Sequence, residues 1–99
     1  MITVGLLVRL EAKPGKEEEL AAFLMKGLEL ANQETTTPLW CALRLEGASF
    51  AIFDAFADES GRHAHLSGPI AKALTAQAPH LLAEAPAIQH VDVMGAKLP

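Results

Sequence analysis

A single acidic residue interrupts the most apolar strand-like stretch of the chain, and it is the first candidate for chemistry. Asp54 lies within SFAIFDAFA (49–57), whose other residues are apolar apart from Ser49. A carboxylate in such surroundings is expected to be partly buried. We predict that it acts as a base, orients a catalytic histidine or anchors a substrate. The alternative is a structural carboxylate, paired with a backbone donor or with Arg9 or Arg44.

Two histidines follow shortly after, and their spacing limits what they can do. His63 and His65 lie two residues apart in a segment expected to be helical, so their side chains point about 200° apart. They therefore cannot hold one metal ion as an i, i+4 pair does, and no other spacing predicts a metal site. His65 is the candidate general base, because imidazole titrates near neutral pH. The alternative for both is a surface or capping position, and His80 and His90 are expected at the surface.

A third group of candidates lies in LWCALRLE (39–46). Trp40 is the only tryptophan, and it is predicted to line an apolar pocket or to pack in a subunit interface. Arg44 falls on the same strand face, where it would neutralise an anionic substrate or face solvent. Cys41 faces the other way and is interpreted as a small buried hydrophobe.

Composition excludes several classes of protein. The 99 residues are 51% hydrophobic and 20% charged, with a formal net charge of −4. This is enough for one domain over 1–99 and excludes a disordered chain. The chain has no cluster of Lys or Arg that would indicate nucleic-acid binding. Arg9 and Glu11 break the N-terminal apolar run too early for a signal peptide or a membrane span. The lone Cys41 fits a reducing compartment, so we expect a soluble cytoplasmic protein.

Hydrophobic periodicity predicts the elements that must position these residues. Strands are expected over 2–12, 39–46, 49–57 and 87–98, and helical segments over 15–32, 58–66 and 69–83. Pro14 is placed to open the first helix and Asp58 to cap the second. Gly47 and Ala48 form the turn of a hairpin, and Pro79 is expected to kink or restart the last helix.

The order of these elements predicts a fold of the α+β class. The arrangement is β-α-β-β-α-β, ferredoxin-like, with a four-stranded antiparallel sheet, helices on one face, and the first and third strands in the centre. Both central strands are apolar on both faces, yet the helices suffice for one face only. An identical sheet across a two-fold axis is the most economical cover for the other. We therefore expect a homodimer that pairs through its sheet faces.

Several strings along the chain resemble those of one family. They are KPGKEEELAAFL (13–24), FDAFADE (53–59), AHL (64–66) and IQHVDV (88–93). On these strings the chain resembles the antibiotic biosynthesis monooxygenase family of dimeric α+β barrel proteins. The likeness covers about residues 3–95. It implies the ferredoxin-like barrel fold, a homodimer, and a cavity in each subunit between sheet and helices.

The resemblance also implies an activity and a set of site residues. Several members oxidise small phenols or quinols with dioxygen and use no metal, flavin or haem. The chain is thus expected to be a cofactor-independent monooxygenase, with His65 as base and Asp54 orienting it or the substrate. Trp40, Phe53, Phe56 and Arg44 would bind the substrate, although strand alternation puts Phe53 on the face opposite Asp54 and Phe56.

Two alternatives remain open at this level. The family often has Tyr and Glu where this chain has Phe53 and Asp54, and the missing hydroxyls favour a non-catalytic dimeric barrel that binds a small apolar molecule. A metal-free isomerase would use the same acid–base pair without consuming oxygen.

Overall fold

One antiparallel sheet and three helices make up the fold in the computed structural model, which describes residues 1–99. In chain order the elements are β1 (Val4–Glu11), α1 (Glu17–Ala31), β2 (Leu39–Arg44), β3 (Ser49–Phe56), α2 (Glu59–Leu66), α3 (Pro69–Leu81) and β4 (Ala87–Asp92). The strand order is β2-β3-β1-β4, so β1 and β3 are central and adjacent. The predicted ferredoxin-like α+β fold is therefore confirmed, with two successive helices, α2 and α3, between β3 and β4.

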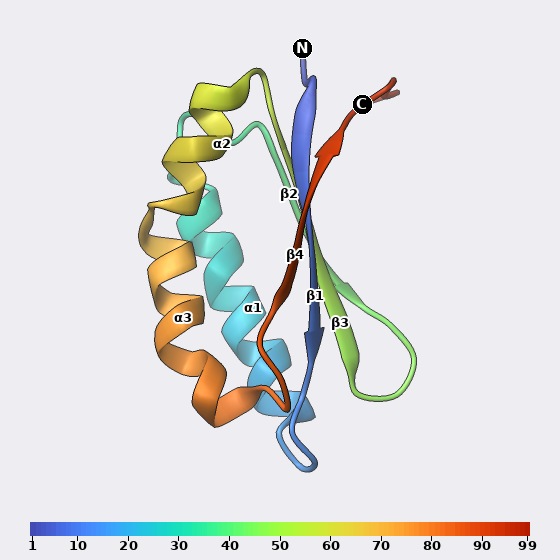
Figure 1. Ribbon diagram of the computed structural model, residues 1–99, viewed down its shortest axis with the longest axis vertical. Coiled ribbons are helices and arrows are strands. Elements are labelled where there is room, and N and C mark those ends of the chain that lie inside the picture. The colour runs from blue at the N-terminus through green and yellow to red at the C-terminus, as the bar shows by residue number, and fades with distance from the viewer.

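The three helices lie on one side of the sheet, and nothing covers the other side (Figure 1). Alternation along the strands decides which residues face the helices. On β3 the even-numbered residues do so, together with their register partners on β1 and β2. The register therefore puts Asp54 beside Leu6 on one strand and Trp40 on the other.

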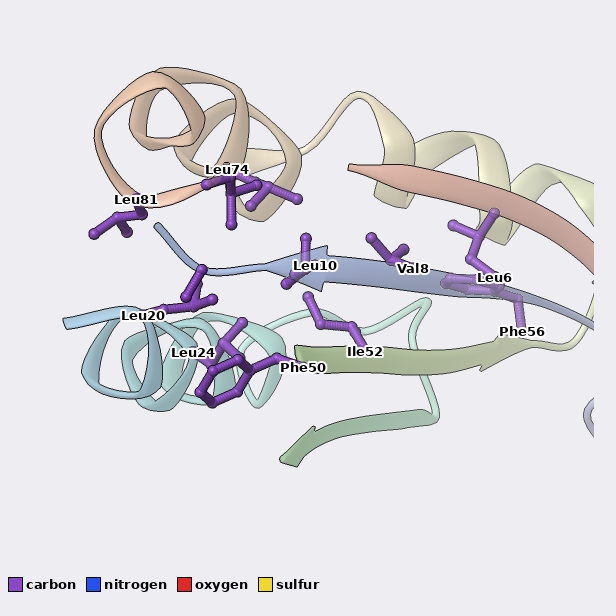
Figure 2. Packing of buried hydrophobic residues seen from close by; sticks show 12 residues of the cluster. Leu6, Val8, Leu10, Leu20, Leu24, Phe50, Ile52, Phe56, Leu74 and Leu81 are labelled. Carbon is purple, nitrogen blue, oxygen red and sulfur yellow. The ribbon is translucent and has the colours of Figure 1, made fainter. Parts of the chain in front are cut away.

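Apolar side chains fill the space between the sheet and the helices. Figure 2 shows Leu6, Val8 and Leu10 of β1 beside Phe50, Ile52 and Phe56 of β3, with leucines of α1 and α3 packed over them. Leu6, Leu10, Leu20, Phe50 and Phe56 are at most 2% exposed. This packing leaves a polar residue such as Asp54, which lies between Ile52 and Phe56 on the same face, fully enclosed.

Local signals explain most of the element boundaries, and the predicted end of the last strand was wrong. The Asp58 side chain accepts a hydrogen bond from the Gly61 backbone N–H, and this caps α2 as predicted. Helix α3, predicted over 69–83, continues through Pro79 to Leu81, so of the kink or restart expected at this proline the restart is absent. Strand β4 ends at Asp92 rather than at 98, because its partner β1 begins at Val4 and offers few further backbone groups; beyond it only the Val93 N–H still pairs, with Thr3.

The uncovered face of the sheet is apolar at its centre. Leu7 and Phe53 are register partners there, both half-buried, and Cys41 of β2 is the next residue across. Leu43, on the same face of β2, is 43% exposed. The expectation that both sheet faces are apolar is thus met. None of the three helices combines the length and apolar content needed to cross a membrane.

Candidate functional site

The histidine that the sequence singles out lies between two carboxylates. His65 Nε2 is 3.0 Å from Asp54 Oδ2, and His65 Nδ1 is 2.8 Å from Glu34 Oε1. Asp54 is 1% exposed and His65 6% exposed. His65 and Asp54 therefore lie side by side, as the sequence led us to expect, and both are buried. Glu34, the second carboxylate beside His65, was not among the predicted site residues.

Helix α2 brings His65 to the sheet because small and charged residues along it allow a close approach. A side chain at Gly61 would press against the carbonyl oxygen of Thr36 and the Cβ of Phe56. Buried Arg62 donates to the carbonyl oxygens of Gly5 and Val91 and forms an ion pair with Glu59. These contacts fix α2 against the ends of β1 and β4, with the ring of His65 turned inward.

Glu34 was missed by the sequence analysis. It lies in the connection between α1 and β2, and its Oε1 also accepts a hydrogen bond of 2.6 Å from Thr37 Oγ1. The stretch ETTTP (34–38) predicts only the end of a helix. Glu34 is also separated from His65 by 31 residues of sequence. The one local signal is the spacing of Glu34 and Thr37, which suits a hydrogen bond within a turn.

The surroundings of His65 determine its charge. Burial lowers its pKa, but the hydrogen bonds and negative charges of Asp54 and Glu34 raise it more, so that the pKa lies above its ordinary value. Since each ring nitrogen faces a carboxylate oxygen, both can act as N–H donors. The two carboxylates therefore favour the imidazolium form of His65.

Three buried polar atoms in this region have no hydrogen-bond partner. They are Asp54 Oδ1, Glu34 Oε2 and Trp40 Nε1. Trp40 and Asp54 lie directly opposite each other on β2 and β3 and share the helix-facing side. The indole packs against Gly27 of α1, where a Cβ would be 3.2 Å from the ring. A buried free acceptor and a buried free donor thus belong to neighbouring residues of β3 and β2, and such unpaired groups are uncommon in folded proteins.

The other predicted site residues lie at varying distances from the network formed by Asp54, His65 and Glu34. Phe56 is buried, with its ring centroid 5.4 Å from that of His65. Phe53 lies on the uncovered sheet face, as the alternation indicated. Arg44 lies at the far end of β2, where it is exposed, pairs with Glu18 and stacks over Phe50. Trp40 faces the helices, so its predicted place in an interface between sheet faces is wrong.

The remaining histidines stay outside the network. His63 is exposed, as are His80, which faces Glu19 at 3.0 Å, and His90. No three His, Cys, Asp or Glu side chains are arranged to hold a metal ion.

The principal hollows of the chain lie elsewhere. One of about 530 Å³ runs between α3 and β4 and is lined mainly by apolar residues, including Leu66, Leu74 and Ile88. Asp54 and His65 line neither this hollow nor any of the other four principal ones. A small molecule bound in any of these five hollows would therefore not touch Asp54 or His65.

Comparison with known proteins shows the family of the chain. The chain is 54% identical to protein NE2512, of unknown function, from Nitrosomonas europaea, with a TM-score of 0.97 over 100% of this chain and 96% of that one. The chain belongs to the NE2512 family. No family model matches the chain, and neither does any curated protein.

More distant structures show the same fold as the NE2512 family. A provisionally named antibiotic biosynthesis monooxygenase from Nitrosomonas europaea matches with a TM-score of 0.83 and 14% identity, over 93% of this chain and 90% of that one. Another, from Caulobacter crescentus, matches with a TM-score of 0.81 and 18% identity, over 95% and 92%. The antibiotic biosynthesis monooxygenase-like fold expected from the sequence is confirmed by these structures.

Proposed function

We propose that the protein oxidises a small phenol or quinol with dioxygen, and that the Asp54–His65–Glu34 network supplies the acid–base chemistry. The observation that carries this proposal is the unpartnered Oδ1 of Asp54. Its companion Oδ2 faces a charged imidazole, so one carboxylate has one occupied and one free oxygen. A buried free acceptor of this kind suits a substrate hydroxyl group.

In this proposal Asp54 takes the substrate proton and His65 orients it. Both ring nitrogens of His65 are already engaged, which leaves no ring nitrogen free to act as the base. The phenolic O–H would donate to Asp54 Oδ1, and the N–H of Trp40 would donate to the same phenolic oxygen. The positive charge of His65 would stabilise the phenolate that forms.

The remaining steps need no further group from the protein. The phenolate passes one electron to dioxygen, and the resulting superoxide and phenoxyl radical join through a new C–O bond. Loss of water then leaves a quinone, so one phenol and one O2 become one quinone and one water. The protein supplies the base and an apolar enclosure that keeps the reactants together. Phe56, whose ring is tilted against that of His65, would form one wall of that enclosure.

The dimer is part of the same proposal. The uncovered face, centred on Leu7 and Phe53, continues across three strands and would be covered by the equivalent face of a second copy. The place we propose for this dimer is the cytoplasm, since the single Cys41 fits a reducing compartment.

A second candidate is a non-catalytic protein that binds a small apolar molecule. The observation that favours it is the burial of Asp54 and His65, which line none of the principal hollows. In that case the network would stabilise the fold, and the hollow between α3 and β4 would hold the ligand. An isomerase on the same scaffold would use the acid–base pair without dioxygen.

Oxygen uptake with a panel of hydroquinones and naphthols tests the proposal. We expect the wild type to consume one O2 per quinone formed and Asp54→Asn to lose about 100-fold or more in kcat, as expected when a general base is removed. Asp92→Asn makes the same chemical change at an exposed position of β4 and is the matched control. Stabilisation by a ligand that is not consumed would favour the binding protein, and conversion without oxygen uptake would favour the isomerase.

A further inference from the structure

Glu34 contacts the network from a third part of the chain. Asp54 belongs to β3 and His65 to α2, whereas Glu34 comes from the connection between α1 and β2. The side chain of Glu34 is 15% exposed, and its Oε1 accepts hydrogen bonds from Nδ1 of His65 and from the hydroxyl of Thr37. Thr37 is itself buried. The orientation of this carboxylate is therefore set by a neighbour that does not touch Asp54.

The start of α3 lies close to Glu34. The second oxygen of Glu34, Oε2, lies 3.8 Å from the position a Cβ would take at Gly68, the N-cap of this 13-residue helix. No side chain caps α3, and the N-terminal end of a helix carries partial positive charge. The Glu34 carboxylate therefore lies between this end of α3 and Nδ1 of His65, with Oε2 near the helix and Oε1 on the imidazole.

The charged Glu34 determines how the imidazole can face Asp54. With Nδ1–H directed at Glu34, the ring is oriented so that Nε2 faces Asp54 Oδ2. Without that acceptor, the ring could rotate or keep a single proton on Nε2. Asp54 and Glu34 are the charged groups that contact His65; Arg62 and Glu59, on the same helix, pair with each other.

We propose that Glu34 is a positioning residue of the active site. By accepting from Nδ1, Glu34 fixes the ring of His65 so that Nε2 pairs with Oδ2 of Asp54. The other oxygen of Asp54, Oδ1, is then left free for the substrate. This inference rests on the proposed function. Thr37 supports it by holding the Glu34 carboxylate in place.

The first test needs no activity. In Glu34→Gln the amide oxygen can still accept from Nδ1 and from Thr37, but the negative charge is gone. Nitrogen-15 NMR of the His65 side chain should show a lower pKa in this variant than in the wild type. Glu29→Gln removes an exposed carboxylate of α1 and should leave the His65 signals unchanged. Unchanged His65 signals in Glu34→Gln would overturn the inference, whatever the enzyme assay shows.

The second test separates positioning from a merely structural role. Glu34→Gln should lower kcat about 10-fold, the lower end of the losses seen when the carboxylate partner of a metal-binding histidine is replaced, with KM little changed. The alkaline limb of the kcat/KM profile should move to lower pH. Thr37→Val should reproduce part of this loss and Thr37→Ser should restore it. Lower thermal stability with an unshifted pH profile would contradict a positioning role.

The two tests keep the inference and the proposed function apart. If no phenol or quinol is oxidised by the wild type, the proposed function fails, and the inference fails with it as a statement about catalysis. If the wild type is active but Glu34→Gln has the wild-type pH profile and kcat, the function stands and the inference fails.

Discussion

His65 and its two carboxylates give this protein an unusual expected response to pH. The raised pKa of His65 means that the folded state holds the imidazolium proton more tightly than the unfolded chain does. The contribution of protonated His65 to the free energy of unfolding is therefore complete below its pKa in the unfolded chain, about 6.5. This contribution is lost as the pH rises through the higher pKa of His65 in the folded state. Exposed carboxyls with lowered pKa values, such as Glu18 and Glu59, change stability only at acid pH.

We predict that the melting temperature falls as the pH is raised from about 6 to about 9, and that His65→Gln removes most of this dependence. Each 1 kcal/mol lost lowers the melting temperature of a domain of this size by about 4–8 °C. Circular dichroism melts of both proteins at matched ionic strength measure the effect. A wild-type curve that is flat, or rises with pH, would show that the pKa of His65 is not raised in the folded state.

At this scale the sequence predicted part of the site. Asp54 stood out because it interrupts an apolar strand, and His65 because it titrates near neutral pH and lies in the AHL string (64–66) that resembles the family. Glu34 could not be predicted, because its role depends on a contact between segments 31 residues apart. Trp40 lies opposite Asp54 because of the register between β2 and β3. The hydrophobic pattern of the two strands alone does not fix this register.

At the scale of elements, the site depends on the close approach of β1 and β3 at Gly5. A Cβ on Gly5 would lie 2.6 Å from the carbonyl oxygen of Asp54, with the side chains of Phe53 and Val91 at 3.3 Å. Since a backbone oxygen cannot turn aside as a flexible side chain can, the two strands would have to separate.

We predict that Gly5→Ala destabilises the fold by about 1–3 kcal/mol, the usual cost of overpacking. Gly95→Ala is the control, because a Cβ there meets nothing within 4 Å, and it should be neutral. Urea unfolding followed by tryptophan fluorescence, which reports Trp40, measures both. Equal midpoints for the two variants would contradict the packing described for β1 and β3.

The elements themselves were largely predictable, because their signals are local. The amphipathic α1 and the β2–β3 hairpin differ from the prediction by two residues at most. The end of α3 at Leu81 rather than at 83 depends on tertiary contacts: Lys13 donates to the Pro79 carbonyl oxygen, and the N–H of Ala83 pairs with Glu11 rather than with the helix. The early end of β4 likewise depends on where β1 begins.

At the scale of the whole molecule, the bare sheet face predicts the association state. The protein should sediment with twice its 10.5 kDa chain mass. Phe53→Lys puts a charge at the centre of that face and should give monomers, because a buried unpaired charge is costly. Ala22→Lys, at an exposed position of α1, should leave the dimer intact. Sedimentation of the wild type as a monomer at micromolar concentration would contradict the proposed covering of the sheet.

The measurement that tests the central claim most directly is the ionisation state of a bound phenol. A chromophoric phenol such as 4-nitrophenol is titrated with the protein under argon, below the pH at which it ionises in water, and its absorbance is recorded. The account predicts the phenolate spectrum with the wild type and with Asp92→Asn, and the neutral spectrum, or no binding, with Asp54→Asn. Binding to the wild type with the neutral spectrum, or a phenolate spectrum that survives Asp54→Asn, would contradict the role given to Asp54.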